Sequence, residues 1–212
     1  MAYLCPMTEH LNASYWESLW QNAETRWDLQ SVSPPLAAYI DQIPMEKRDL
    51  TVLIPGCGNG YEAAYLLENG FTHVTMLDIA PTAVETVRQR YQDRAPAPHL
   101  VCGDFFEHDD RYDLILEQTF FCALHPSMRE AYALKMKQLL RPGGTLAGVL
   151  FDREFPPGPP FGGSRSEYQQ LFAPHFFIQT LAPCYNSAAP RAGTEVFIIL
   201  KAVPPGSNSG NR

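Results

Sequence analysis

Cysteine is scarce in this sequence, and the cysteines that are present do not form pairs. They stand at positions 5, 57, 102, 122 and 184, an odd number with no C-x-x-C spacing. A disulfide framework normally uses an even set of cysteines, and a structural zinc site needs closely spaced ligands. The sequence therefore predicts neither feature and favours a protein of a reducing compartment.

Positive charge and long apolar runs are also scarce. Lys and Arg number 16 against 23 Asp and Glu, a net charge of −7, and no basic stripe is present that would neutralise phosphates. No apolar run approaches the ~20 residues of a membrane-spanning helix, and the first twenty residues contain no secretory signal. We therefore expect a cytoplasmic monomer that acts on a small molecule and has neither a nucleic-acid nor a membrane partner.

The length of the chain sets its domain organisation. A chain of 212 residues fits one domain with an N-terminal elaboration, and 45% hydrophobic residues are enough for a sizeable core. We expect an N-terminal helical lid at 1–45, a ligand-binding domain at 46–204 and a disordered tail at 205–212.

The most informative stretch is 50–61, LTVLIPGCGNGY. A short apolar run stops at glycines 56, 58 and 60, which predicts a buried strand, a tight turn and a helix. Glycine permits positive φ and leaves room for a ligand against the backbone, beside the free N–H groups of the helix N-terminus. The pattern indicates a nucleotide-like pocket, although a plain glycine turn has a similar pattern and the dinucleotide spacing G-x-G-x-x-G is absent.

Strand and helix patterns alternate from this stretch onward. Helices are expected at 61–68, 81–91, 127–140 and 164–172, and strands at 72–77, 99–102, 112–117, 145–151, 176–181 and 195–203. Such alternation predicts an α/β fold, with helices on both faces of a parallel sheet. Ligands in these folds bind outside the carboxyl ends of the strands.

Two acidic residues follow strands at that edge. Asp78 lies 20 residues beyond Gly58, where a carboxylate would accept from both hydroxyls of a ribose; the alternative is an N-cap for the next helix. Asp104 and Phe105 follow the third strand. They would meet the edge and the face of an adenine, or else form a turn with a buried phenylalanine.

An aromatic loop follows the fourth strand. Residues 118–126, QTFFCALHP, are unusually apolar for a loop and predict a pocket wall, to which Phe161 would add. Glu117 and His125, at the two ends of this loop, are candidate general bases, with purely structural roles as the alternative. A capping box at 127–130 predicts the start of the next helix.

Three tryptophans, at 16, 20 and 27, precede the first core strand. Trp16 and Trp20 are four residues apart and would share one face of an amphipathic helix, with Trp27 in a more polar continuation. Such a helix either docks on the domain or forms a lid whose indole rings cover a cationic ligand.

Six motifs together carry a family resemblance: W-x3-W-x6-W at 16–27, V-L-I-P-G-C-G-x-G at 52–60, L-D-I at 77–79, D-F-F at 104–106, F-F-C-A-L-x-P-x-M-R at 120–129 and G-P-P-F at 158–161. With them the chain resembles the thiopurine S-methyltransferase superfamily of class I S-adenosylmethionine (SAM) methyltransferases. Within it, the chain is most similar to the plant thiol, halide and thiocyanate methyltransferase branch. The resemblance implies a Rossmann-like three-layer sandwich with a seven-stranded, mostly parallel sheet whose last strand is antiparallel.

The resemblance also implies roles for individual residues. The expected SAM-binding residues are Trp16, Trp20 and Trp27, then Gly56, Cys57, Gly58 and Gly60 at the methionine end, Asp78 and Ile79 at the ribose, and Asp104 and Phe105 at the adenine. Apart from the resemblance, Glu117 is expected to bind the SAM amino group if it is not the base. The expected substrate-binding residues are Trp27, Gln118, Phe120, Phe121 and Phe161.

Gln118 bears on the methyl acceptor. The thiopurine enzymes have an arginine at the matching position, so its absence favours a small thiol, hydrosulfide, halide or thiocyanate as the acceptor. The alternatives are a thiopurine-type aromatic thiol methyltransferase and a SAM-binding protein without turnover. A nicotinamide oxidoreductase is disfavoured because neither its glycine spacing nor a Tyr-x-x-x-Lys motif is present.

Overall fold

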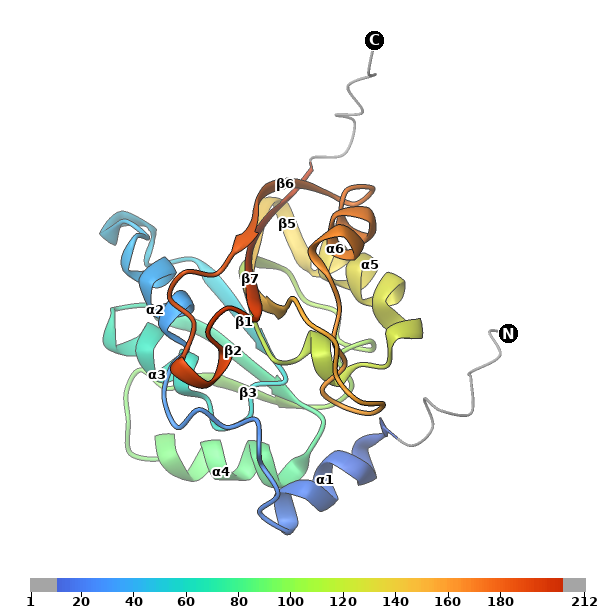
Figure 1. The fold of residues 1–212 in the computed structure, drawn as a ribbon. Coiled ribbons are helices and arrows are strands. Elements are labelled where there is room, and N and C mark those ends of the chain that lie inside the picture. Colours follow the sequence, from blue (N-terminus) through green and yellow to red (C-terminus); the bar gives the residue numbers. More distant parts are fainter. Residues whose placement is uncertain (1–10, 204–212) are drawn as a thin grey trace.

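The computed structural model describes residues 11–203; Cys5 and the predicted tail lie outside the described residues. Its centre is one sheet of seven strands in the order β3-β2-β1-β4-β5-β7-β6 (Figure 1). β7 is antiparallel to both of its neighbours, and the other strand pairs are parallel. The predicted α/β fold with an antiparallel last strand is therefore confirmed, whereas the division at residue 45 stays a prediction.

The elements follow the predicted alternation. The strands are β1 (Thr51–Pro55), β2 (His73–Asp78), β3 (His99–Cys102), β4 (Tyr112–Gln118), β5 (Leu140–Phe151), β6 (Phe176–Pro183) and β7 (Glu195–Ala202). The helices are α1 (Ala13–Gln21), α2 (Pro34–Asp41), α3 (Tyr61–Glu68), α4 (Pro81–Tyr91), α5 (Arg129–Leu139) and α6 (Arg165–Phe172). Short 3-10 helices are η2 (Met45–Lys47), η3 (Phe121–Ala123), η4 (Pro126–Met128) and η5 (Ala189–Arg191). Within residues 11–203, no helix combines the length and the apolar character needed to cross a membrane.

The sheet has a hydrophobic core on each face because strand side chains alternate in direction. In β1, Val52 and Ile54 belong to the core beneath α2, α3 and α4, whereas Leu53 belongs to the core beneath α5 and α6. Both faces of the central strands are covered, so these strands are continuously apolar. The carboxyl ends of β1, β2, β3 and β4 consequently share one edge of the sheet.

Two local predictions are corrected. The capping box predicted at 127–130 does not form, because η4 comes first with His125 as its N-cap, and α5 begins only at Arg129. β5 begins at Leu140 rather than at residue 145. Leu140 pairs with Tyr112 of β4, and the register shifts before Thr145.

Candidate active site

The glycine turn lies at the carboxyl end of β1 and is built of left-handed backbone. Gly56, Gly58 and Gly60 have φ of +58°, +50° and +71°. A Cβ added at Gly56 would lie 2.6 Å from Cδ2 of Phe120, and one added at Gly60 would collide with Cε of Met76. Glycine is needed at these two positions both for the backbone conformation and for the close approach of a neighbouring side chain.

Asp78 fixes this turn from the end of the adjacent strand β2. Its Oδ2 accepts from Gly58 N at 3.1 Å and its Oδ1 accepts from Ala80 N at 3.0 Å. Burial raises the pKa of this carboxyl, although the backbone N–H groups of Ala80, Gly58 and Ile79 oppose that effect. The N-cap residue of α4 is Ala80, so the alternative interpretation of Asp78 as an N-cap is wrong. Each carboxylate oxygen keeps a second lone pair for a ligand, and Ile79 lies beside it, half-buried.

The two residues predicted to contact adenine, in the turn after β3, lie in different surroundings. Gly103 N donates to the Asp78 carbonyl at 3.0 Å, which joins this turn to the glycine site. Asp104 is exposed at the edge and accepts from Phe106 N at 2.8 Å. Phe105 is only 3% exposed and packs edge-to-face on Phe120, with ring centroids 5.0 Å apart. Phe105 therefore supports the wall of the site from the core.

The three tryptophans come together over the turn. α1 ends at Gln21, so Trp27 lies in the following loop rather than on a continuing helix. Its ring centroid is 5.8 Å from that of Trp16 and 6.3 Å from that of Trp20, both in edge-to-face geometry. Cζ2 of Trp20 lies 3.8 Å from the point where a Cβ on Gly58 would stand.

Glu117 is fully buried behind the aromatic loop. Its Oε1 accepts from Phe120 N at 2.8 Å and Phe121 N at 2.9 Å, and its Oε2 accepts from the Tyr132 hydroxyl at 2.6 Å. Burial raises the pKa of Glu117 to about 7. Both oxygens are used inside the protein and none of the side chain is exposed, so the geometry supports Glu117 as the residue that shapes the loop. It gives no support to Glu117 as a base or as a SAM ligand.

Gln118 and Thr119 bring the loop to the glycine turn. Thr119 has a φ of +61°, a conformation that costs a non-glycine residue about 1–2 kcal/mol. Oε1 of Gln118 is buried and has no hydrogen-bond partner among the described residues. Both side chains line a cavity of about 50 Å³, whose other walls are Trp27, Asp28, Leu29, Ser31, Ile54, Gly56, Cys57, Gly58, Asn59, Tyr61 and Glu62.

Phe161 and His125 lie together on the other side of the aromatic loop. Phe161 N donates to the Cys122 carbonyl at 2.7 Å, and the Phe161 ring lies 5.4 Å from the His125 ring. Nδ1 of His125 accepts from Ser127 N at 3.3 Å and lies 2.8 Å from Oγ of Ser127, so the neutral ring carries its proton on Nε2. Phe121 is 1% exposed and belongs to the core, so it supports the loop rather than lining the cavity.

Sequence reasoning missed several polar residues around the cavity. Asp28 Oδ2 accepts from Nδ2 of Asn59 at 2.9 Å, and Glu62, itself buried, accepts from Ser33 N at 3.3 Å. Nη2 of Arg191, from the far end of the chain, donates to the Trp27 carbonyl at 2.9 Å. Asp28 could have been predicted near the site because it directly follows Trp27 in the sequence. No local pattern indicates Arg191, which is 164 residues away from Trp27.

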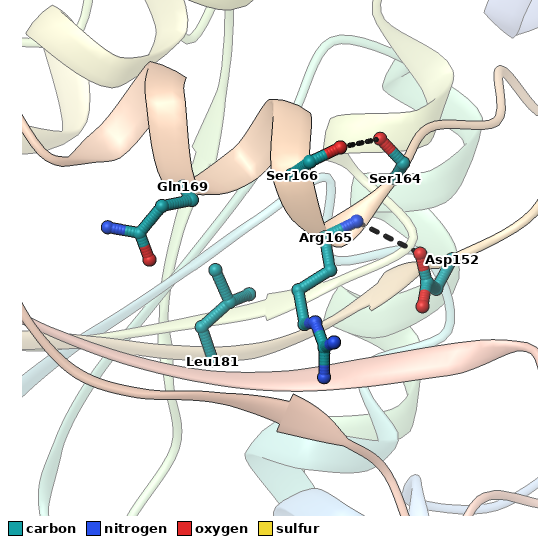
Figure 2. Close-up of a pocket in the computed structure, with 6 residues that line it drawn as sticks. All are labelled: Asp152, Ser164, Arg165, Ser166, Gln169 and Leu181. Atoms are coloured by element: carbon teal, nitrogen blue, oxygen red, sulfur yellow. Dashed lines mark hydrogen bonds between the residues drawn. The ribbon is translucent and has the colours of Figure 1, made fainter.

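A larger recess, about 490 Å³ and widely open, lies at the start of α6 (Figure 2). Two hydrogen bonds join residues that line it. Arg165 N donates to Oδ1 of Asp152 at 2.9 Å, and Ser164 Oγ lies 3.0 Å from Ser166 Oγ. None of the predicted site residues lines it. We therefore place the candidate active site at the smaller cavity beside the glycine turn.

Comparisons with known proteins show the family of the chain. The family model described as thiopurine S-methyltransferase matches residues 11–196. The chain is 35% identical over 189 residues to the probable thiol methyltransferase 2 of Arabidopsis thaliana, covering 85% of this chain and 81% of that protein. It is 29% identical over 197 residues to thiocyanate methyltransferase 1 of Brassica oleracea, covering 89% and 85%.

A solved structure with the same fold is that of Burkholderia thailandensis 1,6-didemethyltoxoflavin-N1-methyltransferase, with 1,6-didemethyltoxoflavin and S-adenosylhomocysteine bound. The TM-score is 0.73 at 21% identity, over 96% of this chain and 93% of that one.

Proposed function

Because the chain belongs to the thiopurine S-methyltransferase family of SAM-dependent methyltransferases, we propose that it methylates a small thiol, hydrosulfide, halide or thiocyanate. The observation that carries this proposal is Gln118, a neutral side chain on the cavity wall at the end of β4. The two curated relatives, named for thiol and thiocyanate acceptors, support the same choice.

The residues around the glycine turn fit SAM. Oxygen acceptors line the cavity and suit the ammonium group at the methionine end: Oε1 of Gln118, which has no partner among the described residues, and the carboxylates of Asp28 and Glu62. Asp78, at the next strand, has lone pairs left for the ribose hydroxyls. The indole of Trp20 lies above the turn, where it would face a sulfonium.

In the proposed reaction the protein aligns SAM with the methyl acceptor and excludes water from them. SAM supplies an electrophilic methyl group on a positively charged sulfur. An anionic acceptor cancels that charge on the way to the transition state, so an aromatic pocket that excludes water favours the reaction. Phe120 beside Gly56, Trp20 near Gly58 and Trp27 on the cavity wall provide such surroundings. Holding the reactants in line is worth about 7–11 kcal/mol of the barrier.

The need for a general base depends on the acceptor. A halide has no proton to lose, and a thiol with a pKa of ~8.5 is already a few per cent ionised at neutral pH. Glu117 is enclosed by the loop and the Tyr132 hydroxyl. His125 is no better placed as a base, because its Nδ1 accepts from Ser127 N at 3.3 Å and the neutral ring therefore carries its proton on Nε2. The proposal accordingly uses only the ionised fraction of a thiol acceptor.

Two parallel assays test this proposal on the purified protein with SAM. Gas chromatography of the headspace measures methylated hydrosulfide, iodide and thiocyanate, and a second assay measures methylated thiopurine. We expect volatile products to form at the higher kcat/KM. A preference for the thiopurine would refute the acceptor class. Binding of SAM by isothermal titration without any product would identify a SAM-binding protein that does not turn over.

A further inference from the structure

α1, the helix that carries Trp16 and Trp20, buries little apolar surface against the rest of the protein. None of its residues is buried, and it contacts mainly α4, beside which it lies in Figure 1. Burial of apolar surface supplies most of the stability of a docked helix. α1 therefore needs some other contact to hold its tryptophans over the glycine turn.

The N-terminus of α4 needs a partner as well. Its N-cap residue is Ala80, which has no side-chain acceptor, and Pro81 at the first position has no N–H. The first N–H that needs an acceptor is that of Thr82. An anion is also favoured at this point because the helix dipole places partial positive charge there.

Glu17 of α1 meets this need. Its Oε2 accepts from Thr82 N at 2.9 Å and its Oε1 accepts from the Thr82 hydroxyl at 2.6 Å. The Thr82 N–H is the largest influence on the Glu17 carboxyl and lowers its pKa. Both carboxylate oxygens are thus engaged by one residue, 65 positions away in the chain.

We propose that Glu17 is a positioning residue that fastens the tryptophan helix over the SAM site by capping α4 in trans, and so sets how fast the bound nucleoside leaves. Trp16 and Trp20 flank Glu17 on α1, and Trp27 packs on both rings. Releasing the carboxylate frees the helix that places Trp20 over Gly58. This inference rests on the proposed SAM site.

The chain provides its own reporter for the test. All three tryptophans are at positions 16, 20 and 27, so intrinsic tryptophan fluorescence reports on this segment alone. Dissociation of S-adenosylhomocysteine is followed by stopped-flow fluorescence and its affinity by isothermal titration. The variants are Glu17→Ala, Thr82→Val, Thr82→Ser and the double variant Glu17→Ala with Thr82→Val. Glu24→Gln is the matched control, since Glu24 is exposed and has no side-chain bond among the described residues.

We expect Glu17→Ala to speed dissociation by about tenfold, the scale of a lost hydrogen bond to a charged group. The KM for SAM should rise while kcat does not fall. Thr82→Val should have a smaller effect, Thr82→Ser should restore wild-type dissociation, and the double variant should match Glu17→Ala. Dissociation unchanged in Glu17→Ala, or effects of Glu17 and Thr82 that add, would refute the fastening role. Failure of the wild-type protein to bind S-adenosylhomocysteine would instead refute the proposed SAM site.

Discussion

The buried Glu117 gives a quantitative prediction about stability. Its pKa is raised from 4.5 to about 7 by burial, a rise of about 2.5 units. A folded-state pKa above the unfolded value means that the folded protein binds more protons between the two values. The free energy of unfolding therefore falls as the pH rises from about 4.5 to about 7, by about 3 kcal/mol from this group alone at ~1.4 kcal/mol per unit.

Glu117→Gln removes this titration and keeps the shape of the site. The amide oxygen still accepts from Phe120 N and Phe121 N, and the amide nitrogen donates to the Tyr132 oxygen, which reverses one bond. Relative to wild type, we expect the variant to gain stability by about 3 kcal/mol between pH 4.5 and pH 8.

Urea denaturation at half-unit pH intervals measures this difference. Subtracting the wild-type curve removes the contributions of the other buried carboxyls to the pH dependence of the free energy of unfolding. These include Asp78, Glu62 and Glu195, whose pKa values are also raised by burial. Glu107→Gln is the control, because Glu107 is exposed and its side chain has no hydrogen bond among the described residues. A difference between Glu117→Gln and wild type that stays constant with pH would show that Glu117 is not a buried titrating group.

Three further outcomes are expected. Asp78→Ala should weaken SAM binding at least tenfold by isothermal titration, since its carboxylate holds Gly58 N; an unchanged affinity removes Asp78 from the site. Gly56→Ala should destabilise the fold by about 1–2 kcal/mol, because the backbone is left-handed and the new methyl meets Phe120; an unchanged melting temperature contradicts this. Gln118→Arg should shift kcat/KM toward anionic aromatic thiols by restoring a cation near the acceptor, and competing-substrate assays in which the ratio does not move would count against the role of Gln118.

Local patterns in the sequence predicted most of the helices and strands and the position of the glycine turn. The strand ends at glycines 56, 58 and 60, which all have positive φ. Only glycine adopts this conformation easily and also leaves room for Phe120 at Gly56 and for Met76 at Gly60. The alternation of strands and helices placed the ends of four parallel strands at one edge, and Asp78 with them. The antiparallel seventh strand came from the family resemblance, since no local period specifies strand direction.

Only the tertiary structure decided which side chains line the cavity and which are enclosed in the core. Glu117 is enclosed because α5 brings Tyr132 to its second oxygen, and Phe105 and Phe121 are in the core because α5 packs on that face of the sheet. Arg191 reaches Trp27 from 164 residues away, and Glu17 reaches Thr82 from 65. The sequence by itself determined the glycine turn and the edge of the sheet where the proposed SAM site lies, because backbone conformation and residue period are local properties. The direction of a carboxylate or an indole depends on the helix that packs against it, and that contact exists only in the folded chain.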